Sequence, residues 1–136
     1  MPVAGYSGTP LVKKLGIKAG HVVGLVQPPD HVMDLLVDLP EDATVRVGAR
    51  GKPDVSLVFV RKIADLAKRV EQLWRLAFPN RAVWVCWPKK SSALYQDLRE
   101  DDIRTHVLGR GLVDVKVCAV DGDWSGLKLM VRKELR

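Results

Sequence analysis

Apolar positions change their spacing several times along the chain, and each change marks a different element. Near-continuous apolar runs at 55–60 and 82–87 are typical of strands that are buried on both faces, and residues 22–26 predict a further strand. Apolar residues within 63–77 recur every three or four positions, which predicts an amphipathic helix. Residues 113–120 alternate between apolar and polar for most of their length, which favours a less buried strand.

Cap and turn residues divide the chain between these runs. Thr9 and Asp97 are predicted to cap helices, and Asp97 forms a capping box with Glu100. Asp121 and Gly122 predict the tight turn of a hairpin. The predicted elements in chain order are helix 9–15, strand 22–26, helix 30–36, strand 43–47, strand 55–60, helix 63–77, strand 82–87, helix 97–108, strand 113–120 and strand 124–132.

This order of elements predicts the fold class. Strands that alternate with helices indicate a mainly parallel sheet with right-handed crossovers, and the last two strands add an antiparallel hairpin. We therefore expect a three-layer, Rossmann-like α/β fold, with residues 1–136 as a single domain.

The connection formed by residues 48–54 leaves open how the strands on either side of it pair. If strands 43–47 and 55–60 are parallel, the connection must recross the sheet, and at full extension it spans only about 20–25 Å. An antiparallel pairing of the two strands through a hairpin loop is the alternative.

Composition limits the protein class. Hydrophobic residues make up 47% of the chain, which is enough for a sizeable core without metals or crosslinks. No apolar run is long enough to span a bilayer, and residues 1–20 lack the apolar core of a secretory signal. Cys86 and Cys118 lie inside apolar runs, where unpaired buried cysteines are common. We therefore expect a cytoplasmic protein that does not associate with membranes.

The net charge of +6 is concentrated in one stretch of the chain. Residues 61–96 contain eight basic and two acidic side chains, whereas basic and acidic residues balance in 1–60 and in 97–136. Lys68, Arg69 and Arg75 fall within the predicted helix and are expected on its solvated face. Four cations of this stretch fall at loop positions and need another explanation: Arg61, Lys62, Lys89 and Lys90.

Several polar residues follow the predicted parallel strands directly. Ligands of open α/β sheets bind beyond the carboxyl ends of such strands, and helix N-termini add partial positive charge there. The expected ligand-binding residues are Gln27, His31, Arg61, Lys62, Trp87, Lys89 and Lys90. A basic face of this kind suits an anionic small molecule, an acidic partner protein or nucleic acid. A solvated rim that keeps the protein soluble is the alternative.

Two further features are candidates for binding a partner. Lys13 and Lys14 either belong to an ordinary amphipathic helix or close over the basic face. Trp124 lies next to the predicted hairpin turn, where an exposed tryptophan would anchor a partner and a buried one would pack in the core.

The order of elements over residues 9–133 resembles that of class I methyltransferases, with the first half shortened to two strands. The resemblance implies that the last strand inserts antiparallel between the two strands before it. The motifs differ, because that fold places glycines after its first strand so that backbone N–H groups approach the cofactor. Here the loop reads Gln27-Pro28-Pro29-Asp30, and no acidic residue follows Val47 to hold a ribose. We therefore expect no cofactor, S-adenosylmethionine in its usual position included.

Three blocks of sequence together resemble a family of small bacterial proteins that is classified only as a domain of unknown function. They are GYSGTPLVKKLGI at 5–17, WPKK at 87–90, and 111–120 followed by WSGL at 124–127. This resemblance implies no activity.

Familiar catalytic and metal-binding patterns are incomplete. The three histidines fall in different elements and neither cysteine has a CxxC partner, which argues against a metal site. The leading hypothesis is a non-catalytic domain that binds an anion through its basic face. The alternatives are a small enzyme that acts on a phosphorylated or carboxylated metabolite, with His31 as its titratable group, and a nucleic-acid-binding protein.

Overall fold

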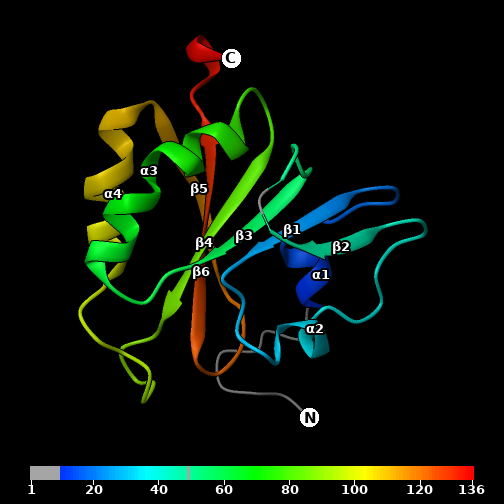
Figure 1. Ribbon diagram of the computed structural model, residues 1–136, viewed down its shortest axis with the longest axis horizontal. Helices are drawn as coiled ribbons and strands as arrows, with labels where there is room; N and C mark the ends of the chain where they lie inside the picture. The colour runs from blue at the N-terminus through cyan, green and yellow to red at the C-terminus, as the bar shows by residue number, and fades with distance from the viewer. Residues whose placement is uncertain (1–9, 49) are drawn as a thin grey trace.

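A computed structural model describes residues 10–48 and 50–136, and Figure 1 shows a central sheet between two layers of helices. The sheet has six strands in the order β2-β1-β3-β4-β6-β5. The strands are β1 (Val22–Val26), β2 (Thr44–Val47), β3 (Val55–Phe59), β4 (Ala82–Pro88), β5 (Leu112–Ala119) and β6 (Trp124–Val131). The helices are α1 (Leu11–Lys14), α2 (Val32–Leu35), α3 (Ile63–Ala77) and α4 (Glu100–Val107), with short 3-10 turns at Leu108–Arg110 and Lys133–Leu135.

The pairing of the strands confirms the predicted fold class. β2, β1, β3 and β4 are parallel, and β6 lies antiparallel between β4 and β5. The sheet is therefore mainly parallel and ends in an antiparallel pair. The chain has the three-layer, Rossmann-like fold that its sequence predicts.

The connection between β2 and β3 recrosses the sheet. Both strands pair parallel with β1, one on each side of it, so the hairpin alternative is wrong. The connection packs Pro53 against β1, where a Cβ atom on Gly24 would lie 2.7 Å from the Pro53 Cγ atom. Glycine at position 24 thus leaves room for a short loop where a crossover helix is more usual.

Each face of the sheet has its own core. Helices α3 and α4 cover one face, and α1 and α2 lie on the other (Figure 1). Leu66, Leu73 and Ile103 belong to the first core, and Leu15, Val32 and Trp84 belong to the second. No helix in the described part of the chain is long and apolar enough to cross a membrane.

The start of α4 differs from the prediction. The helix begins at Glu100, and the Arg99 N–H donates to the Asp102 carboxylate at 2.9 Å. Asp97 lies before this helix, and its Oδ1 atom accepts a hydrogen bond from the Ile63 N–H at the start of α3. The predicted capping box of Asp97 and Glu100 is therefore wrong, because Asp97 satisfies a free N–H of a different helix. The predicted cap at Thr9 lies outside the described residues.

Both cysteines are free thiols. Cys86 of β4 and Cys118 of β5 face Gly126 of β6 from opposite sides, so a strand separates them. Burial raises the pKa of the Cys86 thiol well above its usual value, and Cys118 and Asp121 add to the shift. A protonated, buried thiol is a poor nucleophile, so Cys86 acts as a small apolar core residue.

Candidate functional site

The register of the strands places the predicted basic residues at one edge of the sheet. Val26 pairs with Val58 and Phe59 pairs with Cys86, so all three strands end at the same level. Arg61 and Lys89 follow the ends of the adjacent strands β3 and β4. They therefore lie at the carboxyl edge together, as the sequence predicts, and Pro88 pairs there with Trp124 of the hairpin.

A hollow of about 740 Å³ lies at this edge, next to the point where the chain connections diverge from β1 and β3. Ligands of doubly wound sheets usually bind at such a point. We call it the carboxyl-edge hollow, and its polar lining residues are Gln27, Arg61, Asp65, Lys68, Arg69 and Gln72. Three cations face one carboxylate, so the hollow is electropositive.

Helix α3 supplies most of the polar lining of this hollow. Asp65, Lys68, Arg69 and Gln72 follow the spacing of one helical stripe, and the Arg69 guanidinium donates to Gln72 Oε1 at 2.8 Å. Sequence reasoning assigned Lys68 and Arg69 to a solvated helix face. The polar stripe itself was the signal that could have placed them beside the strand ends.

Trp87, Lys89 and Lys90 line a second hollow of about 510 Å³ rather than the first. It also includes Arg99, Glu100 and Asp101 from the start of α4, so its positive charge is largely offset. The predicted basic face is thus divided into two hollows. Lys62 is exposed and precedes α3, and it is not among the lining residues of either one.

His31 is paired with the hairpin instead of facing a hollow. Its Nε2 atom lies 2.7 Å from Asp121 Oδ2, while Asp121 Oδ1 accepts the N–H groups of Asp123 and Trp124 at 2.8 Å each. Asp121 is buried, with 7% of its surface exposed. This carboxylate therefore joins the loop after β1 to the tip of the β5–β6 hairpin.

Trp124 is not an exposed anchor, so that reading of the sequence is wrong. Its side chain is 1% exposed and packs edge-on against Phe59, with ring centroids 5.2 Å apart. The Arg61 guanidinium lies 5.3 Å from the centroid of the Trp124 ring. The tryptophan is buried because β6 is inserted between two strands and its side chain points into the α1–α2 layer. Its ring makes a cation–π contact with the Arg61 guanidinium.

Lys13 and Lys14 sit on helix α1, as predicted. Lys13 is exposed, while the Lys14 ammonium donates to the Ala119 carbonyl at the end of β5, at 3.4 Å. Lys14 therefore helps to join α1 to the hairpin.

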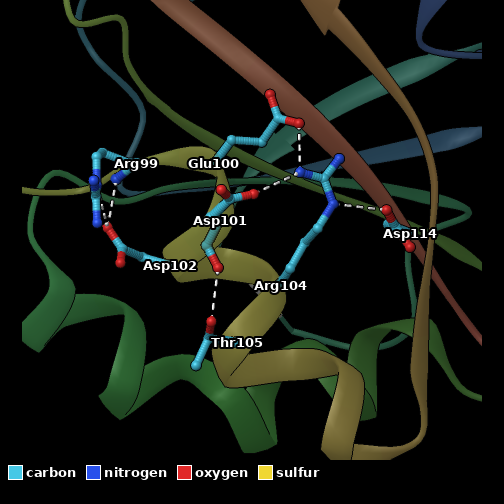
Figure 2. A network of polar contacts seen from close by, with 7 residues as sticks. All are labelled: Arg99, Glu100, Asp101, Asp102, Arg104, Thr105 and Asp114. Carbon is cyan, nitrogen blue, oxygen red and sulfur yellow. Dashed lines mark hydrogen bonds and ion pairs between the residues drawn. The ribbon is translucent and has the colours of Figure 1, made fainter.

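A network of charged side chains joins α4 to β5 (Figure 2). Arg104 contacts Glu100 at 2.5 Å and Asp101 at 3.4 Å on its own helix, and its Nε atom donates to Asp114 Oδ2 at 2.8 Å. Its hydrogen bonds with Asp114 and Glu100 raise the pKa of Arg104, so its charge is permanent. This network fixes the helix whose start borders the second hollow.

We expect this network to make stability depend on pH in acid. The Arg104 hydrogen bond lowers the pKa of the Asp114 carboxyl in the folded protein. The contribution of this ion pair to stability is therefore complete above the ordinary aspartate pKa of about 3.9, and it is lost as the pH falls through the lower pKa of the folded state. Urea unfolding in steps from about pH 6 to about pH 2 should show the loss. Asp114→Asn and Arg104→Met should both flatten this acid limb. An unchanged limb in both variants would contradict the assignment.

Comparisons with known proteins agree with the fold. A methyltransferase from Aquifex aeolicus that depends on S-adenosylmethionine superposes with a TM-score of 0.60 at 15% identity, covering 90% of this chain and 88% of that one. TrmN from Thermus thermophilus gives 0.58 at 10% identity, covering 90% of this chain and 47% of TrmN. A possible exported protein from Bordetella parapertussis gives 0.60 at 9% identity, covering 87% and 63%. The fold is that of the methyltransferases. No family model and no curated protein matches the sequence.

The residues of this chain do not fit the usual cofactor cradle of that fold. After β1 the chain reads Gln27-Pro28-Pro29, in which two residues lack an N–H and Gln27 has a φ of +54°. β2 ends at Val47, and neither this residue nor Gly48 after it supplies a carboxylate for a ribose. S-adenosylmethionine would find neither its backbone donors nor its ribose acceptor here. No group of three or more metal-ligating side chains occurs within residues 10–48 and 50–136.

Proposed function

We propose that this methyltransferase-like domain binds a small anionic molecule in the carboxyl-edge hollow and does not transfer methyl groups. The observation that carries the proposal is the lining of that hollow, where Arg61, Lys68 and Arg69 face a single carboxylate. Its position at the divergence of β1 and β3 is where ligands of this fold class bind.

Arg61 has the central role in this proposal. It comes directly after the buried β3 strand, and the ring of Trp124 lies under its guanidinium. A supported guanidinium loses less conformational freedom on binding and can present two parallel N–H groups to a phosphate or carboxylate. Gln27 and Gln72 add neutral donors and acceptors at the same hollow.

The proline loop after β1 supports a binding function without methyl transfer. A domain that has this fold but not the glycine loop retains the hollow and loses the donors that hold the usual cofactor. The free thiols of Cys86 and Cys118 fit the reducing cytoplasm, where we place this function.

Arg61→Ala is the test. Thermal and urea unfolding are measured with pyrophosphate, adenosine triphosphate, citrate and S-adenosylmethionine, because a bound ligand stabilises by mass action, by about 2.7 kcal/mol at a hundredfold excess over Kd. We expect at least one of the first three to stabilise the wild type, and Arg61→Ala to weaken its binding by about tenfold or more.

Two further variants control this experiment. Lys68→Met removes a lining cation that has no core contact, and it should weaken binding as well. Arg75→Ala removes an exposed cation from the same helix, outside the hollow, and it should leave binding unchanged. Stabilisation by S-adenosylmethionine alone would refute the proposal, as would equal effects of Arg61→Ala and Arg75→Ala. Binding only of an acidic protein or of nucleic acid would refute the small-molecule assignment.

A further inference from the structure

A third hollow, of about 350 Å³, lies at the opposite edge of the sheet. It borders the starts of β3 and β4 and the turn before β1, so the length of the strands separates it from the carboxyl-edge hollow. We call it the amino-edge hollow, and its polar lining includes Lys18, His21, Asp54, Arg81 and Lys128.

Positive charge predominates in the amino-edge hollow. Lys18, Arg81 and Lys128 face a single carboxylate, Asp54, and one oxygen of that carboxylate already accepts the Val22 N–H at 2.8 Å. None of the salt bridges among the described residues includes any of the three cations. The three positive charges in the lining therefore exceed the single negative charge of Asp54.

Lys128 occupies an unfavourable position for a cation. It is half-buried in β6 and lies directly opposite Lys116 of β5, and like charges in such a cross-strand pair are destabilising. Burial lowers the pKa of its ammonium, and Lys116 and Lys18 lower it further. Gly16 lies beside the ammonium, since a Cβ at that position would be 4.0 Å from the Lys128 Nζ atom. A bound anion would offset both the burial and the repulsion.

His21 adds an N–H donor to this set. Its Nδ1 atom accepts the Lys18 N–H at 3.1 Å, which leaves Nε2 as the ring nitrogen that carries a proton. The hollow thus combines two ammonium groups, a guanidinium and an imidazole N–H, which are the donors that a phosphate with its several acceptor oxygens requires.

We propose that the amino-edge hollow is a second site, which binds a phosphate group through Lys18, Arg81 and Lys128. This site is independent of the carboxyl-edge hollow and of any ligand bound there. The phosphate is either free, as inorganic phosphate or a monoester, or part of a phosphodiester chain.

Titration with inorganic phosphate tests the site. Binding is followed by calorimetry and by backbone amide NMR at constant ionic strength, with sodium chloride as the reference titration so that screening is separated from binding. We expect shifts for residues 16–21 and 81, and binding about tenfold weaker in Lys128→Met and in Lys18→Met. Lys128→Met should be at least as stable as the wild type without phosphate, since the charge it removes is disfavoured by folding.

Variants outside the hollow complete the experiment. Arg61→Ala should leave phosphate binding at the amino edge unchanged, which separates this site from the proposed function. A single-stranded oligonucleotide that displaces phosphate would identify a phosphodiester as the bound group, and failure to displace it would identify free phosphate or a monoester. The site is refuted if phosphate shifts no amide near position 18 beyond the chloride reference, or if Lys128→Met binds phosphate as tightly as the wild type.

Discussion

Replacing Trp124 with alanine should lower the free energy of unfolding by about 3–5 kcal/mol, the usual cost of removing a buried tryptophan. The side chain is 1% exposed, and its ring contacts both Phe59 and the guanidinium of Arg61. The cavity left behind would lie between the hairpin and β3. Urea unfolding followed by circular dichroism measures the loss directly. A loss below about 1 kcal/mol would show that Trp124 is not part of the core.

A matched pair of conservative variants separates ring packing from hydrogen bonding. Trp124 Nε1 is buried without a hydrogen-bond partner, so Trp124→Phe removes no hydrogen bond. Trp84 Nε1 donates to the Leu15 carbonyl at 3.1 Å, so Trp84→Phe leaves that carbonyl without its donor. We expect Trp84→Phe to cost about 1–3 kcal/mol more than Trp124→Phe. Equal costs would indicate that Trp124 makes a hydrogen bond in solution.

The burial of Trp124 could not be predicted from the sequence of the hairpin. The residue follows a turn, and a turn is compatible with an exposed or a buried side chain. Only the position of β6 inside the sheet decides the question, because the Trp124 side chain then points into the α1–α2 layer that covers this face of the sheet. The sequence supported that insertion solely through its resemblance to a fold.

The main elements were predictable because their apolar patterns are strong. The five residues of β3 are all buried, and α3 buries four positions that the apolar spacing indicates, Leu66, Val70, Leu73 and Ala77. The path of residues 48–54 was not predictable, since the same loop could close a hairpin or cross the sheet. The contact of Pro53 with Gly24 decides between them, and it joins residues far apart in the sequence.

The sequence predicts at which edge of the sheet the candidate site lies, but it does not predict which residues share a hollow there. Parallel strands carry Arg61 and Lys89 to the same edge whatever the details of packing. The packing of the helices decides which cations share a hollow. The rotation of α3 turns Lys68 and Arg69 towards Arg61, and the start of α4 places acidic residues beside Lys90. The pairing of His31 with Asp121 depends on the hairpin and had no local signal.

Asp121 is the residue through which the hairpin and the loop after β1 are coupled. Asp121→Ala should lower the free energy of unfolding by about 3 kcal/mol. It leaves the backbone N–H groups of Asp123 and Trp124 without an acceptor, and the backbone N–H of Trp124 is buried. The His31 ring would lose its partner as well. Urea unfolding gives the stability, and NMR of the His31 ring reports the loss of that contact.

Two variants show which part of Asp121 matters. Asp121→Asn keeps an oxygen that can accept both N–H groups and removes the negative charge, so it should retain most of the stability while weakening the contact with His31. Asp123→Ala changes the exposed neighbour, whose carboxylate accepts the Ser92 hydroxyl, and it should cost less than about 1 kcal/mol. If Asp121→Ala is no more destabilising than Asp123→Ala, the carboxylate does not hold the hairpin tip. The shape of the edge that carries Arg61 would then depend on other contacts, among them the packing around Trp124.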